Sequence, residues 1–273
     1  MVPFYIFYSM FGLQRTMDLC WAAADQRTRG FLIGGTAGRT TLNGEGLQHE
    51  DGHSHILANT IPNCVSYDPT FAHEVAVIMH DGLKRMVERQ ENVFYYITLL
   101  NENYAMPGLL PGTEEQIIKG MYLLQDAGKG KKTDLRVQLL GSGTILREVI
   151  AAAELLDKDF GIKADIWSCP SFTELARDGM DAERWNRFHP EKAQRKPWVT
   201  QLLEGRQGPA ICATDYVRTF ANQIREYVPM RYSVLGTDGY GRSDTRENLR
   251  RHFEVDRWHV AHAAVAALAA EGK

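Results

Sequence analysis

The pattern of apolar and polar positions predicts strands that alternate with helices along the whole chain. Short apolar runs that end at glycine or turn residues are typical of buried strands, and apolar residues at every third or fourth position are typical of helices. Strands are expected at residues 30–35, 64–67, 93–99, 136–140, 164–168, 210–213 and 232–236. Helices are expected at residues 4–26, 68–89, 145–157, 173–187, 198–203 and 217–227, followed by a last helical region. This alternation favours an α/β fold with parallel sheets.

Local signals define the ends of three helices. Residues 2–13 are almost all apolar, but this run is too short to span a membrane. Aromatic residues recur at helical spacing, so we interpret residues 4–26 as a buried helix. Asp68 and Pro69 are a favourable pair for opening a helix. The sequence Asp244-Thr245-Arg246-Glu247 predicts a capping box at the start of the last helical region.

Two Pro-Gly pairs, at residues 107–108 and 111–112, predict a linker between domains. We therefore expect one domain at residues 1–108 and a second at residues 109–273. A length of 273 residues favours two domains of ordinary size, although one large α/β domain would also fit.

Composition and charge narrow the class of protein. The net charge is -3, which gives no electrostatic reason to expect binding to nucleic acid or to an anionic membrane. The four cysteines form no C-x-x-C pair and are interpreted as reduced thiols of a cytoplasmic protein. Arg246, Arg250 and Arg251 form a small basic patch that we interpret as a solvated helix face or a subunit contact. The G-x-G at residues 141–143 lacks the third glycine of a dinucleotide-binding motif.

The densest group of titratable residues lies among glycines in an eleven-residue segment. Its members are Glu45, His49, Glu50, Asp51, His53 and His55. Three interpretations are open: a metal site around His53 and His55, a structural role in which the side chains satisfy loop backbone groups, or general acid–base chemistry by an imidazole beside a carboxylate. A spacing of four places Glu45 and His49 on one face if this segment is helical.

Tyr8, Phe11 and Arg15 form a second candidate group. Their spacing of three and four residues places them on one helix face. Such a face is usually part of a core with a capping cation, but a phenol and a guanidinium could also line a pocket for an anionic substrate.

Three segments carry a resemblance to a known family. They are YSMFGLQR at residues 8–15, GRTTLNGEGLQHEDGHS at residues 38–54 and GTDGYGRSD at residues 236–244. Together they resemble the homodimeric bacterial pyruvate dehydrogenases, the decarboxylating first component of the pyruvate dehydrogenase complex. The similarity runs over essentially the whole chain.

The resemblance implies a transketolase-like, thiamine-diphosphate-binding fold. Residues 1–108 would be the second part of its pyrimidine-binding middle domain, and residues 109–273 its C-terminal α/β domain. The implied activity is oxidative decarboxylation of pyruvate, with acetyl transfer to the lipoyl group of dihydrolipoyl acetyltransferase.

The same resemblance assigns roles to five side chains. Phe11 would pack on the aminopyrimidine ring of thiamine diphosphate. Tyr8, which would also contact the cofactor, and His49 would hydrogen-bond the group derived from pyruvate. Glu45 and Arg15 would be their acidic and cationic neighbours.

The resemblance also places part of the site outside this chain. The glutamate that activates the aminopyrimidine, and the aspartate and asparagine that hold magnesium and the diphosphate, would belong to regions that precede residue 1. We therefore expect this chain to be inactive alone and to hold no metal itself. Two alternatives are a non-catalytic dimerisation or interaction module of the same fold, and a thiamine enzyme for a different 2-oxo acid.

Overall fold

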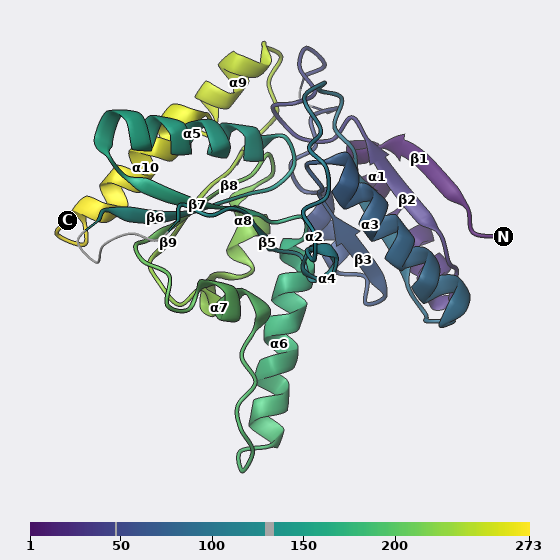
Figure 1. The fold of residues 1–273 in the computed structure, drawn as a ribbon. Coiled ribbons are helices and arrows are strands. Elements are labelled where there is room, and N and C mark those ends of the chain that lie inside the picture. Colours follow the sequence, from purple (N-terminus) through teal and green to yellow (C-terminus); the bar gives the residue numbers. More distant parts are fainter. Residues whose placement is uncertain (47, 129–133) are drawn as a thin grey trace.

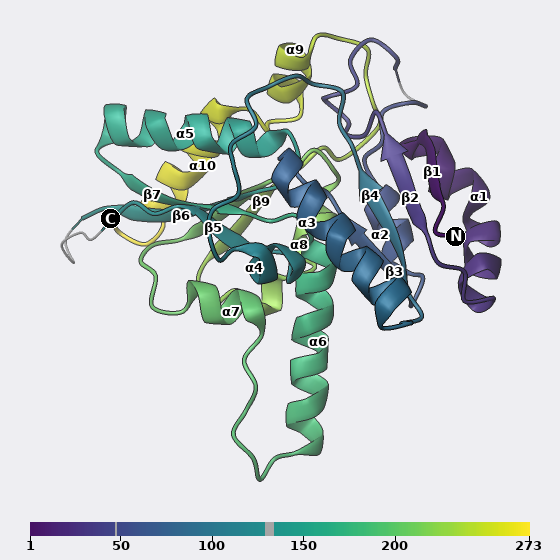
Figure 2. The same ribbon diagram turned by 45° about the vertical axis from the view of Figure 1, so that its right-hand side comes forward.

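The computed structural model describes residues 1–46, 48–128 and 134–273, which form two α/β units side by side (Figure 1). The strands of the first unit are β1 (Phe4–Tyr8), β2 (Phe31–Gly35), β3 (Cys64–Tyr67) and β4 (Phe94–Thr98). They form a parallel sheet in the order β1-β2-β4-β3. Its helices are α1 (Ser9–Asp25), α2 (Ser54–Asn59), α3 (Ala72–Leu83) and α4 (Glu114–Ile118). The first two pack on one face of the sheet and the last two on the other (Figure 2).

The second unit is also a sheet between helices. Its strands are β5 (Tyr122–Gln125), β6 (Arg136–Gly141), β7 (Lys163–Ser168), β8 (Ala210–Ala213) and β9 (Tyr232–Leu235). Their order is β5-β7-β6-β8-β9, with only the β5–β7 pair antiparallel. Its helices are α5 (Ile145–Phe160), α6 (Phe172–Phe188), α7 (Trp198–Leu203), α8 (Arg218–Asn222), α9 (Arg246–His252) and α10 (Arg257–Ala269). Helices α5, α9 and α10 contribute to the core on one face, and α6, α7 and α8 to the core on the other.

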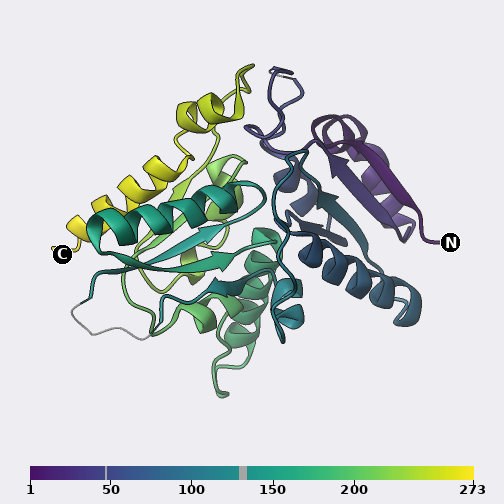
Figure 3. The same ribbon diagram turned by 45° about the horizontal axis from the view of Figure 1, so that its top comes forward.

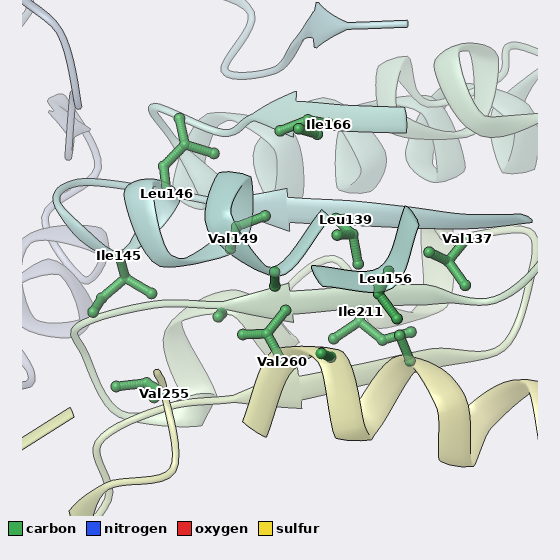
Figure 4. Packing of buried hydrophobic residues seen from close by; sticks show 14 of the residues in the cluster. Val137, Leu139, Ile145, Leu146, Val149, Leu156, Ile166, Ile211, Val255 and Val260 are labelled. Atoms are coloured by element: carbon green, nitrogen blue, oxygen red, sulfur yellow. The ribbon is translucent and has the colours of Figure 1, made fainter. Parts of the chain in front are cut away.

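Apolar side chains on β6 explain why this unit has a helix layer on each side. Leu139 belongs to the core that β6 shares with Val149 of α5 and Val260 of α10 (Figure 4). The next residue, Leu140, belongs to the core on the opposite face. Side chains of a strand alternate between faces, so the consecutive apolar residues Leu139 and Leu140 bury β6 on both faces.

The predicted helix at residues 4–26 is wrong in its first part. Residues Phe4–Tyr8 form the edge strand β1, and α1 begins only at Ser9. Phe4-Tyr5-Ile6-Phe7-Tyr8 is composed of aromatic and β-branched residues, which favour a strand, and this composition outweighed the helical spacing. The segment is not buried either, because Ile6 is 71% exposed.

The predicted start of the helix after β3 is also wrong. Helix α3 begins at Ala72, and the carboxylate of Glu74 accepts hydrogen bonds from the backbone N–H groups of Thr70 and Phe71. Asp68 does not cap the helix, because its side chain is directed into the contact between the two units. A π-helical turn follows α3 at Lys84–Glu88.

Three further differences are local. The helix predicted at residues 217–227 consists of the short α8 and a separate 3-10 turn at Arg225–Tyr227. The last helical region contains two helices, and α9 is capped by Thr245, which accepts from the Asn248 N–H, so the predicted capping box is one residue out of place. The antiparallel strand β5 was not predicted. The other predicted strands are confirmed to within two residues at each end.

The two units meet through buried polar groups. Asp68, just after β3, accepts hydrogen bonds from Thr98 at 2.7 Å, Ser142 at 2.8 Å and Tyr216 at 3.3 Å. The last two of these donors belong to the second unit. A carboxylate without water needs such donors, since an unsatisfied buried charge is strongly destabilising.

A carboxylate of the second unit is likewise held by donors of the first unit. Asp215, just after β8, accepts from the backbone N–H and the hydroxyl of Thr40 and from the hydroxyl of Thr41, at 2.6–2.8 Å. Each unit therefore buries one aspartate that is held by hydroxyl groups of the other. These contacts fix the loop after β2 against the second sheet.

The two termini lie at opposite ends of the molecule (Figure 3). The stretch of Pro-Gly pairs expected to hold the domain boundary connects β4 with α4, and the boundary at residue 108 stays a prediction. None of the helices in the described ranges combines the length and apolar character needed to cross a membrane.

Leu139→Ala should lower the free energy of unfolding by about 2–5 kcal/mol, because Leu139 is fully buried and its removal leaves a cavity. Leu19→Ala, at a residue that is 68% exposed, is the matched control and should change it by about 0.5 kcal/mol or less. Chemical denaturation followed by circular dichroism measures both. Equal losses in the two variants would contradict the assigned core.

Burial raises the pKa of Asp68 from 3.8 to about 7. The folded chain therefore keeps a proton that the unfolded chain has released, so this group favours folding below pH 4 and loses that contribution as the pH rises to about 7. Between pH 5 and pH 8 the Asp68→Asn variant should lose less stability than the unchanged chain, by on the order of 2 kcal/mol. Denaturation at several pH values tests this. The control Asp159→Asn, at an exposed site, should follow the unchanged chain.

Candidate active site

Tyr8, Phe11 and Arg15 lie together where the edge strand turns into a helix. Tyr8 is the last residue of β1, and the other two belong to the first turns of α1. The ring centroids of Tyr8 and Phe11 are 6.0 Å apart, and the guanidinium carbon of Arg15 lies 4.2 Å from the centroid of the Phe11 ring. The three side chains lie together as predicted but not on one helix face, because Tyr8 belongs to the strand β1; Tyr8 is 52% exposed.

The loop after β2 brings His49 to this face. The imidazole centroid lies 4.7 Å from that of Phe11 and 6.1 Å from that of Tyr8, with both rings approached edge-on. His49 Nδ1 lies 3.8 Å from an oxygen of Glu45. The residues singled out in two distant parts of the sequence therefore form one cluster. It forms without the helix that was considered for this segment, since neither residues 45–46 nor residues 48–49 are helical.

The cluster is partly open to solvent. The side chains of His49 and Glu45 are 25% and 53% exposed. His49 Nδ1 is buried and has no hydrogen-bond partner among the described residues, because 3.8 Å is too long for a hydrogen bond. Catalytic contacts are often this long without substrate and shorten when it binds. The arrangement offers a phenol, an imidazole, a carboxylate and a guanidinium around one aromatic ring.

Glu50 fixes the His49 segment to the second unit. Its carboxylate accepts the backbone N–H of Arg242 at 2.5 Å. A Cβ at Gly241 would lie 2.6 Å from the same carboxylate, so only glycine permits this close approach. Burial raises the pKa of Glu50 to about 7.

Arg39 also joins the loop after β2 to the second unit. Its guanidinium donates to the carbonyl oxygens of Thr237 and Gly239. Burial lowers its pKa, against the opposing effect of Asp51 and Asp215. Sequence reasoning missed Arg39 as a contact of this loop, and it included Glu50 only as a member of the titratable cluster. Partners almost 200 positions away give no signal in a single sequence.

The other acidic and imidazole groups of the segment are arranged separately. Asp51 accepts from the backbone N–H groups of His53 and Ser54, at the start of α2. His55 is fully buried, lies 2.9 Å from the Thr98 hydroxyl and stacks on Phe220. Burial lowers its pKa to about 4. Among the described residues, no three His, Cys, Asp or Glu side chains are grouped so that they could hold a metal ion.

The polar groups of the G-x-G loop at residues 141–143 are bonded to the first unit. The Ser142 hydroxyl and the Gly143 N–H both bond to Asp68, and Thr144 contacts Thr41. These groups are committed to the contact between the units.

Two family models match the sequence. The Pyruvate dehydrogenase E1 component middle domain matches residues 1–107, and the Transketolase-like TK C-terminal domain matches residues 120–256. The chain is 63% identical over 272 residues to the pyruvate dehydrogenase E1 component of Cupriavidus necator and 63% identical over 277 residues to that of Escherichia coli K12. Both matches cover all of this chain but only 30% of the relative.

Solved structures agree on the fold. Transketolase from Leishmania mexicana superposes with a TM-score of 0.73 at 15% identity, over 98% of this chain and 34% of that chain. A split-gene transketolase described as an inactive beta4 tetramer superposes with a TM-score of 0.63 at 14% identity, over 98% of this chain and 77% of that chain. The fold is therefore transketolase-like, as predicted. The chain belongs to the transketolase-like TK C-terminal domain family, whose model matches residues 120–256, and it is similar over its whole length to pyruvate dehydrogenase E1 components, of whose length it spans about 30%.

Proposed function

We propose that this chain supplies part of the active site for the thiamine-diphosphate-dependent oxidative decarboxylation of pyruvate. The observation that carries the proposal is the meeting of Tyr8 and Phe11 with His49, three residues whose motifs resemble those of the family. We propose residues 1–108 as part of the pyrimidine-binding domain and residues 109–273 as the C-terminal domain.

The side chains present fit the cofactor and the substrate. When bound, thiamine diphosphate supplies the electron sink that decarboxylation of a 2-oxo acid requires. Phe11 offers an aromatic face to its aminopyrimidine ring, and Tyr8 offers a second aromatic side chain beside it. Magnesium and the diphosphate would be held mainly by other regions of the complete enzyme.

The polar groups of the cluster act on pyruvate. Arg15 attracts the substrate carboxylate, since guanidinium groups pair well with carboxylates. Tyr8 donates its O–H to an oxygen of the substrate. His49 directs Nδ1 toward Glu45, which leaves Nε2 as the atom that can hold or move a proton at the substrate. Glu45 would orient the imidazole once substrate binding shortens the 3.8 Å separation to a hydrogen bond.

The partners follow from the same proposal. The acetyl group would pass to the lipoyl group of dihydrolipoyl acetyltransferase, and the complete enzyme would be a homodimer. A different 2-oxo acid as substrate is disfavoured by the 63% identity to pyruvate dehydrogenase E1 components.

One observation favours a second candidate function. The split-gene transketolase shows that a separate chain of this fold can form an inactive tetramer, and the present chain covers 77% of it. A non-catalytic assembly module is therefore the alternative for this chain on its own.

His49→Ala is the direct test of the catalytic role. The assay uses a full-length pyruvate dehydrogenase E1 component in which these 273 residues replace the matching segment. Loss of the proton-transferring imidazole should lower kcat by about 100-fold or more, measured both as release of carbon dioxide and as acetyl transfer. His80→Ala, at an exposed position on α3, should leave both rates unchanged. If both rates survive in the His49 variant, the role is wrong.

The 273-residue chain alone should bind thiamine diphosphate with magnesium weakly or not at all, because the resemblance assigns the diphosphate and magnesium ligands to another domain. Isothermal titration of the chain with cofactor and magnesium measures this. Micromolar affinity would overturn the expectation and show that the Tyr8–His49 cluster holds the cofactor by itself.

A further inference from the structure

Apart from the Tyr8–His49 cluster, a polar cleft lies where three helices of the second unit meet the loop after β4. It has a volume of about 510 Å³ and lies between α5, α9 and the start of α10. Figures 1 and 2 show these helices on the same side of the second sheet. Five arginines line the cleft: Arg147, Arg246, Arg250, Arg251 and Arg257. The three arginines of the basic patch seen in the sequence therefore line a cleft together with two further arginines, Arg147 and Arg257.

Two nearly buried carboxylates hold three of these guanidinium groups. Glu102 pairs with Arg147 at 2.6 Å and with Arg250 at 2.5 Å. Glu148 pairs with Arg257 at 2.9 Å. Burial alone would raise the pKa of Glu102, but the hydrogen bonds and charges of Arg250 and Arg147 outweigh it and lower the pKa. The two carboxylates hold these guanidinium groups in place.

The remaining positive charge is poorly compensated. Arg251 is 63% exposed, and its 3.7 Å contact with the exposed Glu247 is of a kind that contributes little. Arg246 donates to main-chain carbonyl oxygens of Thr41 and Asn101 and lies 4.0 Å from the nearest carboxylate oxygen.

One donor in the cleft is both buried and unpaired. The Arg250 side chain is 7% exposed, and its Nε has no acceptor among the described residues. Asp256 cannot serve the arginines fully, because it accepts from the N–H of His259 and lies 2.7 Å from its imidazole. Crowded guanidinium groups repel each other, and a polyvalent anion would relieve that repulsion.

An aromatic side chain stands beside these charges. Trp258 lines the same cleft and is 58% exposed. An exposed indole is a good surface for stacking a flat ring, and arginine forks match the oxygens of phosphate groups. The net charge of -3 and the cleft volume of about 510 Å³ favour a small ligand over a nucleic acid.

We propose that this cleft binds a nucleoside diphosphate, with the arginines on the phosphates and Trp258 on the base. The site is separate from the Tyr8–His49 cluster and does not depend on the function proposed for it. Its volume is within the usual range for small-molecule sites.

Titration calorimetry of the chain with ADP and with inorganic pyrophosphate tests the proposal. ADP should bind saturably, and Arg251→Ala should weaken both ligands by about tenfold, as expected for loss of one charge-assisted contact. Trp258→Ala should weaken ADP by about fivefold and leave pyrophosphate unchanged, since only ADP carries a ring to stack. Circular dichroism confirms that the variants fold.

Arg184→Ala is the matched control, because Arg184 is an exposed arginine on α6. It should leave both affinities unchanged. Three results would overturn the proposal: no saturable binding of ADP at millimolar concentration, equal effects of Arg251→Ala and Arg184→Ala, or an ADP affinity that Trp258→Ala does not alter.

Discussion

Two carboxylates that are buried between the sheets must find donors, and much of the arrangement follows from how they do so. Asp68 and Asp215 stand at the ends of β3 and β8, in opposite units, and each takes hydroxyl or amide donors from the other unit. A buried charge without donors costs several kcal/mol, so the two sheets cannot shift past each other without losing these contacts. The Thr40 and Thr41 donors also open the loop that carries His49. The geometry of the candidate site is thus set partly by charges that lie outside it.

Much of the fold could be predicted from local pattern. The strand at residues 136–140 was visible because Val137, Leu139 and Leu140 form a short apolar run that ends at a Gly-Ser-Gly turn. The first segment failed because aromatic residues satisfy both periods, and strand pairing with β2 decided between them. Asp68 failed as a helix cap because the second unit competes for its carboxylate. Both errors come from tertiary contacts that no window of sequence contains.

In the candidate site, too, some features could be predicted from the sequence and others depend on tertiary contacts. Resemblance and spacing singled out Tyr8, Phe11 and His49, and the structure brings them together. The contacts of Glu50 and Arg39 with the loop around Gly241 were invisible, since they join residues almost 200 positions apart. A close backbone approach at Gly241 is a feature of three-dimensional packing, and the glycine alone does not reveal which side chain needs the space.

Tyr8 belongs at once to an edge strand and to the candidate site. Within the described residues, β1 pairs only with β2, so one row of its backbone donors and acceptors has no strand beside it. A strand that added to this edge would constrain the backbone of Tyr8, from which the phenol projects. If a small molecule bound at the phenol, as proposed, any coupling between the two binding events would be reciprocal: each would change the affinity of the other by the same factor. Extension of the sheet at β1 would then change the affinity for the small molecule, and binding of the small molecule would change the stability of the extended sheet.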